Sequence, residues 1–445
     1  MRSKSFIATF AGAVLLLVAV PAWAQLPIQS WQTKTGAKVM FVEARGLPML
    51  DLSVDFAAGA AYDTREKAGL AAFTQGMLRA GAGKLSEDDI SRRIADVGAQ
   101  FGGRLDTDRA GLTLRTLTSQ PELEQALAVF TTALQQPAFP ADVLARDQTR
   151  TIGAIKEALT KPETILRRTL YPLMYGAHPY GFPSSGDPET VAALTREDLI
   201  AFYRRHYTAR RATVAMIGAL SRAQAEAIAE RVTAGLPPGE GMGVIPVVTP
   251  PGAGVTRAIP HPASQSHVAL GMPVLKRDDP DYFPLFVGNY VLGGGGFASR
   301  ISDEVRQKRG LAYSAYSYFS PLQQAGPFML GLQTRKDQAD EALAVVRATL
   351  DGFVKNGPTE DELTRAKQNI IGGFPLRIDS NRKIHDFLGV IGFYRLPLTY
   401  LEDFVAAVDK TTTAQIRDAF TRRVDPARLV TVVVGTDEPK AAAAR

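Results

Sequence analysis

The chain has 445 residues, of which 45% are hydrophobic and 22% charged, with no cysteine and a formal net charge of +6. The absence of cysteine excludes disulfides and thiolate chemistry, so the stability of the fold must come from buried apolar cores. The positive charge is mild and no dense Lys/Arg tract is interleaved with aromatic residues, which argues against a nucleic acid as partner.

The first 24 residues have the pattern of a secretory signal peptide. Arg2 and Lys4 give a basic start, residues 6–20 are largely apolar, and Ala22-Trp23-Ala24 is a small-x-small cleavage site. The apolar run is too short for a comfortable membrane span, and no later segment is long and apolar enough to cross a bilayer. We therefore predict export to the periplasm, cleavage that lowers the formal charge to +4, and no stable membrane insertion afterwards.

The remainder of the chain contains an internal duplication. QALAVFTTAL at 125–134 returns as EALAVVRATL at 341–350, and the segment at 194–218 returns at 411–435. The copies lie about 217 residues apart, far more than the period of a solenoid, so the pattern indicates a duplicated domain.

Matching positions of the two copies predict the same local structure. Thr195 and Thr412 each precede a helical pattern and are predicted N-caps, while Leu199 and Ile416 are predicted core positions. Each copy then ends in a β-branched run followed by glycine, which is typical of a strand and its end.

A stretch rich in proline and glycine separates the copies. Residues 236–254 lack helical and strand periodicity, so we interpret them as a linker between an N-terminal lobe, 25–235, and a C-terminal lobe, 255–445. Strand-like runs open both lobes, at 39–42 and 52–56 in the first and at 267–272 in the second. Long helical patterns and further strands follow. The expected fold class is α+β: two homologous lobes, each a mainly antiparallel sheet packed with helices, joined by a linker.

Several long segments resemble the pitrilysin/insulinase-type zinc peptidases, the inverzincins. AGLAAFTQGML at 68–78 corresponds to the helical AGLAHFLEHML of that family. LGGGGFASRISDEVRQKRGLAYS at 292–314 matches a family pattern of mixed character, and the stretch beginning at Leu170 matches as well. The resemblance extends over essentially the whole mature chain.

The resemblance implies that the catalytic zinc site has been lost. In the family, two His one helical turn apart and a later Glu bind zinc, and the Glu before the second His is the general base. The corresponding positions are Ala72, Gly76 and Gly153 for the ligands and Gln75 for the base. Methyl groups and glycine hydrogens offer no lone pair, and a glutamine amide takes no proton from water at neutral pH. We predict no metal, no cofactor and no independent peptidase activity in this chain.

The histidines provide no replacement metal site. None forms an H-x-x-x-H or H-x-H pair, and no cysteine is present to complete a structural zinc set. A serine hydrolase is equally unsupported, because no G-x-S-x-G elbow occurs. We expect structural roles for all five, His178, His206, His261, His267 and His385.

In the second lobe the resemblance implies a role for Arg306 and Tyr313. Arg306 falls near the end of a helical segment, Gly310 is a predicted C′ residue, and Tyr313 lies on the following strand. In the family this arginine holds the substrate backbone, and the tyrosine hydroxyl donates to the substrate carbonyl and to the oxyanion. Without other information, an arginine on a surface helix is more often a solvated charge, and a tyrosine on a strand is more often a core aromatic. The match to the family on both sides of these residues favours a role in substrate binding.

Four consecutive glycines precede this pair. They could let a substrate backbone approach closely, or they could form a tight turn between strand and helix. They are Gly293, Gly294, Gly295 and Gly296.

The resemblance also implies a partner: bacterial and mitochondrial members of the family of this length commonly work as pairs in which one subunit carries the zinc motif and the other the Arg/Tyr pair. We therefore predict a non-catalytic, substrate-binding subunit of an exported heterodimeric zinc metalloendopeptidase. The partner is an HxxEH-containing homologue that holds the zinc, and the substrates are peptides or unfolded proteins bound by strand addition to a sheet edge. The alternative is a stand-alone peptide-binding or structural assembly protein derived from the same fold.

Overall fold

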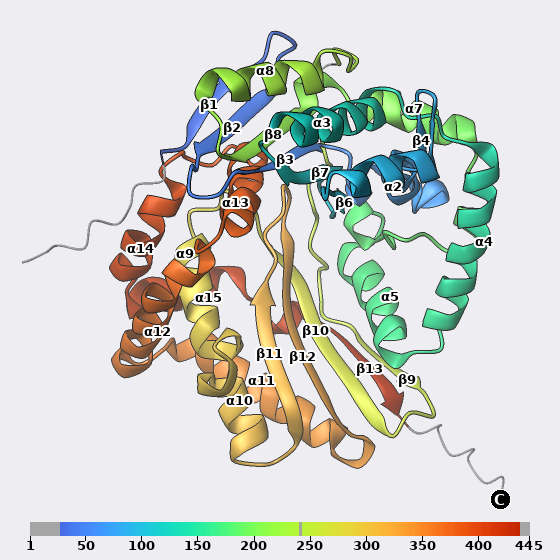
Figure 1. Cartoon of the computed structure of the whole chain (residues 1–445). Coiled ribbons are helices and arrows are strands. Elements are labelled where there is room, and N and C mark those ends of the chain that lie inside the picture. Colours follow the sequence, from blue (N-terminus) through green and yellow to red (C-terminus); the bar gives the residue numbers. More distant parts are fainter. Residues whose placement is uncertain (1–26, 240–242, 437–445) are drawn as a thin grey trace, which may run out of the picture.

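The computed structural model describes residues 27–239 and 243–436 (Figure 1). The predicted signal peptide lies outside the described residues. No helix among the described residues combines the length and apolar character needed to cross a membrane.

The first lobe is built on a six-stranded mixed sheet in the order β1-β2-β8-β3-β7-β6. Only β2 and β8 run parallel, and the other neighbouring strands are antiparallel. Its strands are β1 (Gln29–Gln32), β2 (Lys38–Glu43), β3 (Met49–Phe56), β6 (Gln100–Leu105), β7 (Ala110–Leu117) and β8 (Ala212–Gly218). A short hairpin, β4 (Gly81–Ala82) and β5 (Leu85–Ser86), lies apart from this sheet.

The second lobe repeats the design with a five-stranded mixed sheet in the order β11-β12-β10-β13-β9. Here β13 and β9 are the parallel pair. Its strands are β9 (Thr256–Pro260), β10 (Gln265–Leu275), β11 (Ala312–Phe319), β12 (Gly326–Arg335) and β13 (Val430–Thr436). The predicted α+β class with two mainly antiparallel sheets packed by helices is confirmed.

The helices follow the same duplication. The first lobe contributes α1 (Leu70–Met77), α2 (Glu87–Asp96), α3 (Gln120–Gln135), α4 (Ala141–Ala158), α5 (Pro162–Tyr175), the 3-10 turn η3 (Pro179–Gly181), α6 (Pro188–Ala192), α7 (Arg196–His206) and α8 (Arg222–Thr233). The second contributes α9 (Tyr282–Asn289), the π-helical turns η5 (Tyr290–Gly294) and η7 (Asp303–Gln307), α10 (Arg300–Ser302), α11 (Ala339–Asn356), α12 (Glu360–Gly373), α13 (Asn381–Phe393), α14 (Tyr400–Lys410) and α15 (Thr413–Arg423).

The two predicted threonine N-caps are confirmed. The Thr195 hydroxyl accepts a hydrogen bond from the third residue of α7, and the Thr412 hydroxyl does the same in α15, each within a capping box. The predicted core residues Leu199 and Ile416, one turn later, are fully buried.

The lobes exchange a helix across their junction. Helix α5 belongs by sequence to the first lobe but packs on β10 and β13 of the second, whereas α13 packs on β2, β3 and β8 of the first (Figure 1). Leu170 and Met174 of α5 share a buried cluster with strand β13, and Leu388 of α13 shares another with Met40 of β2. Each sheet therefore has one face covered by a helix from the other half.

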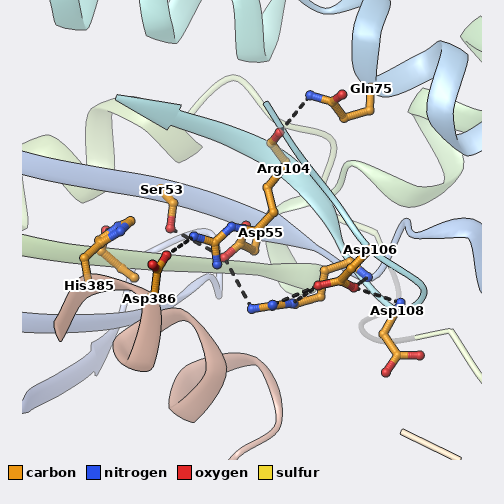
Figure 2. Close-up of polar contacts among 11 residues, drawn as sticks. Ser53, Asp55, Gln75, Arg104, Asp106, Asp108, His385 and Asp386 are labelled. Atoms are coloured by element: carbon orange, nitrogen blue, oxygen red, sulfur yellow. Dashed lines mark hydrogen bonds and ion pairs between the residues drawn. The ribbon is translucent and has the colours of Figure 1, made fainter. Parts of the chain in front are cut away.

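Ion pairs also tie α13 to the first sheet. Arg104 of β6 lies 2.8 Å from Asp386 of α13 and 3.7 Å from the fully buried Asp55 of β3 (Figure 2). Arg109 approaches the same Asp55 carboxylate at 4.0 Å. Because a buried carboxylate is costly unless it is paired, this cluster fixes the position of α13 over the sheet.

The proline- and glycine-rich stretch between the copies lies against the protein where it is described. Ile245 and Val248 are buried in the cluster that contains α5. The Tyr62 hydroxyl donates to the Gly243 carbonyl at 3.3 Å, and His178 Nε2 lies 2.8 Å from the Pro246 carbonyl. This segment thus contributes to the packing between the lobes.

Candidate functional site

Helix α1 carries Ala72, Gln75 and Gly76, three of the positions that correspond to the zinc site. Its N-terminus is capped by the side chain of Asp63, which lies outside the helix. Gly69 precedes the helix with φ of +97°, and the buried Asp63 carboxylate accepts hydrogen bonds from the Gly69 and Ala71 N–H groups at 2.9 and 2.8 Å. Burial raises the pKa of Asp63 to about 7, although these N–H groups favour its charged form. The start of α1 is therefore firmly held.

The positions of the three zinc ligands carry no metal-binding atoms. Ala72 is partly exposed and Gly76 is exposed on α1. A Cβ atom added at Gly76, or at Gly153 on α4, meets no other atom within 4 Å. Within the described ranges, no group of three or more His, Cys, Asp or Glu side chains could hold a metal ion.

The residue at the general-base position turns back into the protein. Gln75 is only 7% exposed, and its Nε2 donates to the Gly111 carbonyl at 3.1 Å (Figure 2). Its amide fills the space beside Gly103, where an added Cβ would fall 1.8 Å from Nε2. The side chain fastens α1 to strands β6 and β7, an arrangement that serves packing and not proton transfer.

Four of the five histidines have identifiable structural contacts. His178 Nδ1 accepts from Tyr180 N, His261 Nε2 lies 2.9 Å from the Thr160 carbonyl, and His385 Nε2 lies 3.2 Å from the Ala215 carbonyl. His206 packs against Phe202, and burial together with nearby arginines lowers its pKa to about 3. His267 lies on β10 as expected.

The structure brings Arg306 and Tyr313 together. Arg306 lies on the π-helical turn η7, which ends at Gln307. Three residues later, Gly310 has φ of +62° and donates its N–H to the Arg306 carbonyl at 3.0 Å. The chain then enters β11, and the Arg306 Cζ lies 4.6 Å from the centroid of the Tyr313 ring. π-helical turns of this kind are frequent at functional sites.

A third residue, Phe297, completes a stack that the sequence reasoning missed. Its ring centroid lies 4.3 Å from Arg306 Cζ, so the guanidinium contacts one aromatic ring through Phe297 and another through Tyr313. Gln307 Nε2 holds the Phe297 carbonyl at 2.9 Å. The only signal in the sequence is a large apolar residue directly after the glycines, where a turn is expected.

The stack is displayed on the surface. Tyr313 is 82% exposed and Phe297 is 64% exposed, whereas Nη1 of Arg306 is buried and has no hydrogen-bond partner among the described residues. A guanidinium held by two rings can still bind an acceptor in its own plane, such as a peptide carbonyl, and the neighbouring phenol can donate a second hydrogen bond.

The glycines before the stack differ in their surroundings. An added Cβ at Gly293 would fall 2.4 Å from Ser317 Oγ, and those at Gly294 and Gly295 would fall within 3 Å of Asn289 Nδ2 and the Tyr290 carbonyl. These three glycines thus have a packing reason inside the chain. An added Cβ at Gly296, which has φ of +61°, would meet open space. The approach of a substrate backbone, one of the two alternatives for these glycines, is therefore unobstructed there.

The comparisons with known proteins agree with this picture. Residues 40–187 match the family model "Insulinase (Peptidase family M16)", and residues 193–370 match "Peptidase M16 inactive domain". A crystal structure of a peptidase M16 inactive domain from Pseudomonas fluorescens superposes with a TM-score of 0.89 at 39% identity, covering 93% of this chain and all of that one. The chain belongs to the peptidase M16 (insulinase) family.

Two sequence relatives differ in how they are described. An uncharacterized zinc protease of Streptomyces coelicolor is 32% identical over 55% of this chain and 54% of its own length. A Helicobacter pylori protein described as a non-peptidase homolog is 24% identical over 85% of this chain and 87% of its own length. The family therefore includes a member already described as lacking peptidase function.

Proposed function

We propose that this protein is the non-catalytic, substrate-binding subunit of an exported heterodimeric zinc peptidase. Its own α1 supplies neither ligands nor base, and its second lobe supplies Arg306 and Tyr313 to a partner that carries an intact HxxEH motif and the zinc. The substrates are peptides or unfolded proteins.

The observation that carries this proposal is the exposed stack of Phe297, Arg306 and Tyr313 in a chain whose hydrolytic positions are Ala72, Gln75, Gly76 and Gly153. The arginine fixed between two exposed rings and the phenol facing solvent form a preorganised binding surface. The conformational entropy of ordering these side chains is lost when the chain folds, and not when a ligand binds. Placed against a partner's metal, the phenol could donate to the developing oxyanion, and the arginine could hold the substrate backbone.

Strand addition fits β6 of the first lobe better than β11 of the second. The outer side of β11 is covered at Ser317, whose carbonyl accepts a hydrogen bond from Asn289 Nδ2 at 3.1 Å. Strand β6 is one of the two edge strands of the first sheet, the other being β1, and its residues Gln100 and Gly103 are exposed. An extended peptide could therefore pair with β6 through backbone hydrogen bonds.

The experiment is affinity purification of the tagged protein from its native cells, followed by peptide-cleavage assays. We expect a stoichiometric homologue with HxxEH, zinc in that subunit, and cleavage by the pair that neither subunit achieves alone. Stoichiometric zinc in this chain together with cleavage by this chain alone would disprove the proposal.

The second candidate is a peptide-binding or assembly protein without a peptidase partner. It is favoured by the Helicobacter pylori relative described as a non-peptidase homolog. A stable homodimer that binds peptides and accelerates no proteolysis supports this candidate over the first.

A further inference from the structure

A separate cavity of about 640 Å³ lies where the two lobes meet. Its walls come from the turn between β6 and β7, the end of β11 and the loop after it, and parts of α5 and α9. Neither Phe297, Arg306 nor Tyr313 lines it. Its volume is within the range of small-ligand pockets, large enough for one or two residues of a peptide.

Tyrosines dominate the walls. Three of them are fixed by their hydroxyl groups: Tyr180 and Tyr394 both donate to the buried Asp108 at 2.8 Å, and Tyr175 donates to the Ala325 carbonyl at 3.2 Å. The full set is Tyr171, Tyr175, Tyr180, Tyr282, Tyr318 and Tyr394. These contacts join both lobes, so the cavity is a rigid part of the fold.

The cavity contains a cation without a matching carboxylate. The guanidinium of Arg277 lies against the Tyr394 ring at 4.9 Å and forms no ion pair within the described part of the chain. Its Nε is buried and lacks a hydrogen-bond partner there. By contrast, Arg109, the other arginine of the lining, is bound to Asp106 at 2.8 Å. Arg277 is thus available for an anionic ligand, and an Arg–carboxylate pair in such a recess is strong.

A free sheet edge leads to this cavity. Strand β6 ends at Leu105, and the next residue, Asp106, is already part of the cavity wall. A strand of six residues spans about 20 Å, so a peptide paired with β6 in parallel orientation would place its following residue at the cavity mouth.

We propose that the lobe-junction cavity binds a carboxylate of a peptide, with Arg277 as the anion-binding residue and the tyrosines as the walls around it. This function goes beyond the heterodimer and requires neither the partner nor zinc, so either proposal can fail without the other. The carboxylate is a C-terminal one or an Asp or Glu side chain at the end of the paired segment.

The test measures the dissociation constants of three fluorescent eight-residue peptides for the full chain by anisotropy. The first ends in a free carboxylate, the second is the same peptide with a C-terminal amide, and the third is the amide with Glu at the last position. We expect the first, the third or both to bind at least about tenfold more tightly than the plain amide. Which of them does so identifies the source of the carboxylate.

Variants locate the effect. Arg277→Gln should reduce the preference for the carboxylate peptides over the plain amide to below about threefold, and Arg277→Lys should restore part of it. Lys276→Gln removes the same charge from the adjacent residue, which lies outside this cavity, and should keep the preference. Three results would overturn the proposal: no peptide binds, the wild type binds all three peptides with equal affinity, or the preference for a carboxylate peptide persists in Arg277→Gln. If the glutamine variant is unstable, the comparison of the three peptides on the wild type still decides.

Discussion

The guanidinium of Arg306 lies 4.6 Å from the ring centroid of Tyr313, and the phenol ring remains largely exposed on the other side. The ring therefore positions the arginine, while the hydroxyl, which forms no hydrogen bond with the described residues, is open to a ligand. The contributions of the ring and of the hydroxyl of Tyr313 can therefore be measured separately by mutation.

Tyr313→Phe keeps the ring and removes the hydroxyl. Under the proposed function the lost hydrogen bond is made in the transition state. In a pair reconstituted with the HxxEH partner we therefore expect kcat to fall about 10- to 100-fold with little change in KM. Steady-state kinetics measures this, with Tyr316→Phe on the same strand as control. An unchanged kcat/KM would remove the assigned role.

Phe297→Ala removes the other ring and leaves Arg306 less ordered. We expect a several-fold higher KM with a smaller effect on kcat, since a freer arginine pays more entropy when it binds substrate. The Tm should change little because Phe297 is 64% exposed. Phe297→Tyr is the matched control and should retain the wild-type KM; equal KM values for the alanine and tyrosine variants would argue against this positioning role.

Gln75→Glu restores the acidic residue of the family but removes a donor. The Gly111 carbonyl loses its hydrogen bond and faces a buried carboxylate, so we expect the free energy of unfolding at pH 7 to fall by about 1–3 kcal/mol. Chemical denaturation tests this. Gly76→Ala, one residue later on an open face, should instead be stabilising by about 0.5–1 kcal/mol.

Asp108→Ala should weaken the junction between the lobes. Asp108 accepts hydrogen bonds from Tyr180, Tyr394 and the N–H of Gln323, which come from both halves of the chain. Leaving these donors unpaired should cost about 3–5 kcal/mol in the free energy of unfolding, visible as a lower Tm. The exposed Asp278→Ala is the control, and an equal Tm for the two variants would contradict this role.

The lowered pKa of Asp281 leads us to expect that the free energy of unfolding decreases at acidic pH. Hydrogen bonds from Arg422 and Arg423 lower its pKa to about 2, below the value near 3.9 expected in the unfolded chain. Its contribution is therefore present above pH 4 and is lost as the pH falls toward 2. Asp281→Asn should be less stable than wild type by about 1–2 kcal/mol at pH 7, and the difference should narrow by pH 3. Denaturant titrations at both pH values measure this; a constant difference would refute it.

The duplication made the local structure readable from the sequence. Thr195 and Thr412 were predicted as caps because the same cap-and-core spacing occurs twice, and Gly310 because a helix end commonly needs a left-handed residue. The exchange of α5 and α13 could not be read in this way. An amphipathic pattern shows that a helix has an apolar face but does not identify the sheet that covers it.

The site was predictable only in part. The family resemblance supplied Arg306 and Tyr313, and the structure places them in contact. Phe297 was missed because an apolar residue in a glycine-rich turn has no periodicity from which to infer its neighbours. The inward turn of Gln75 depends on the space beside Gly103, which arises only when β6 and α1 meet.

The exchanged helices have a consequence for how the chain is made. When the first half leaves the ribosome, the inner face of its sheet, including Met40 and Ile217, has no cover until α13 has been synthesised. A cut between residues 236 and 254 before that point would leave this apolar face of the first sheet exposed to water. Although the two halves are copies of one domain, each needs a helix from the other half to cover one face of its sheet.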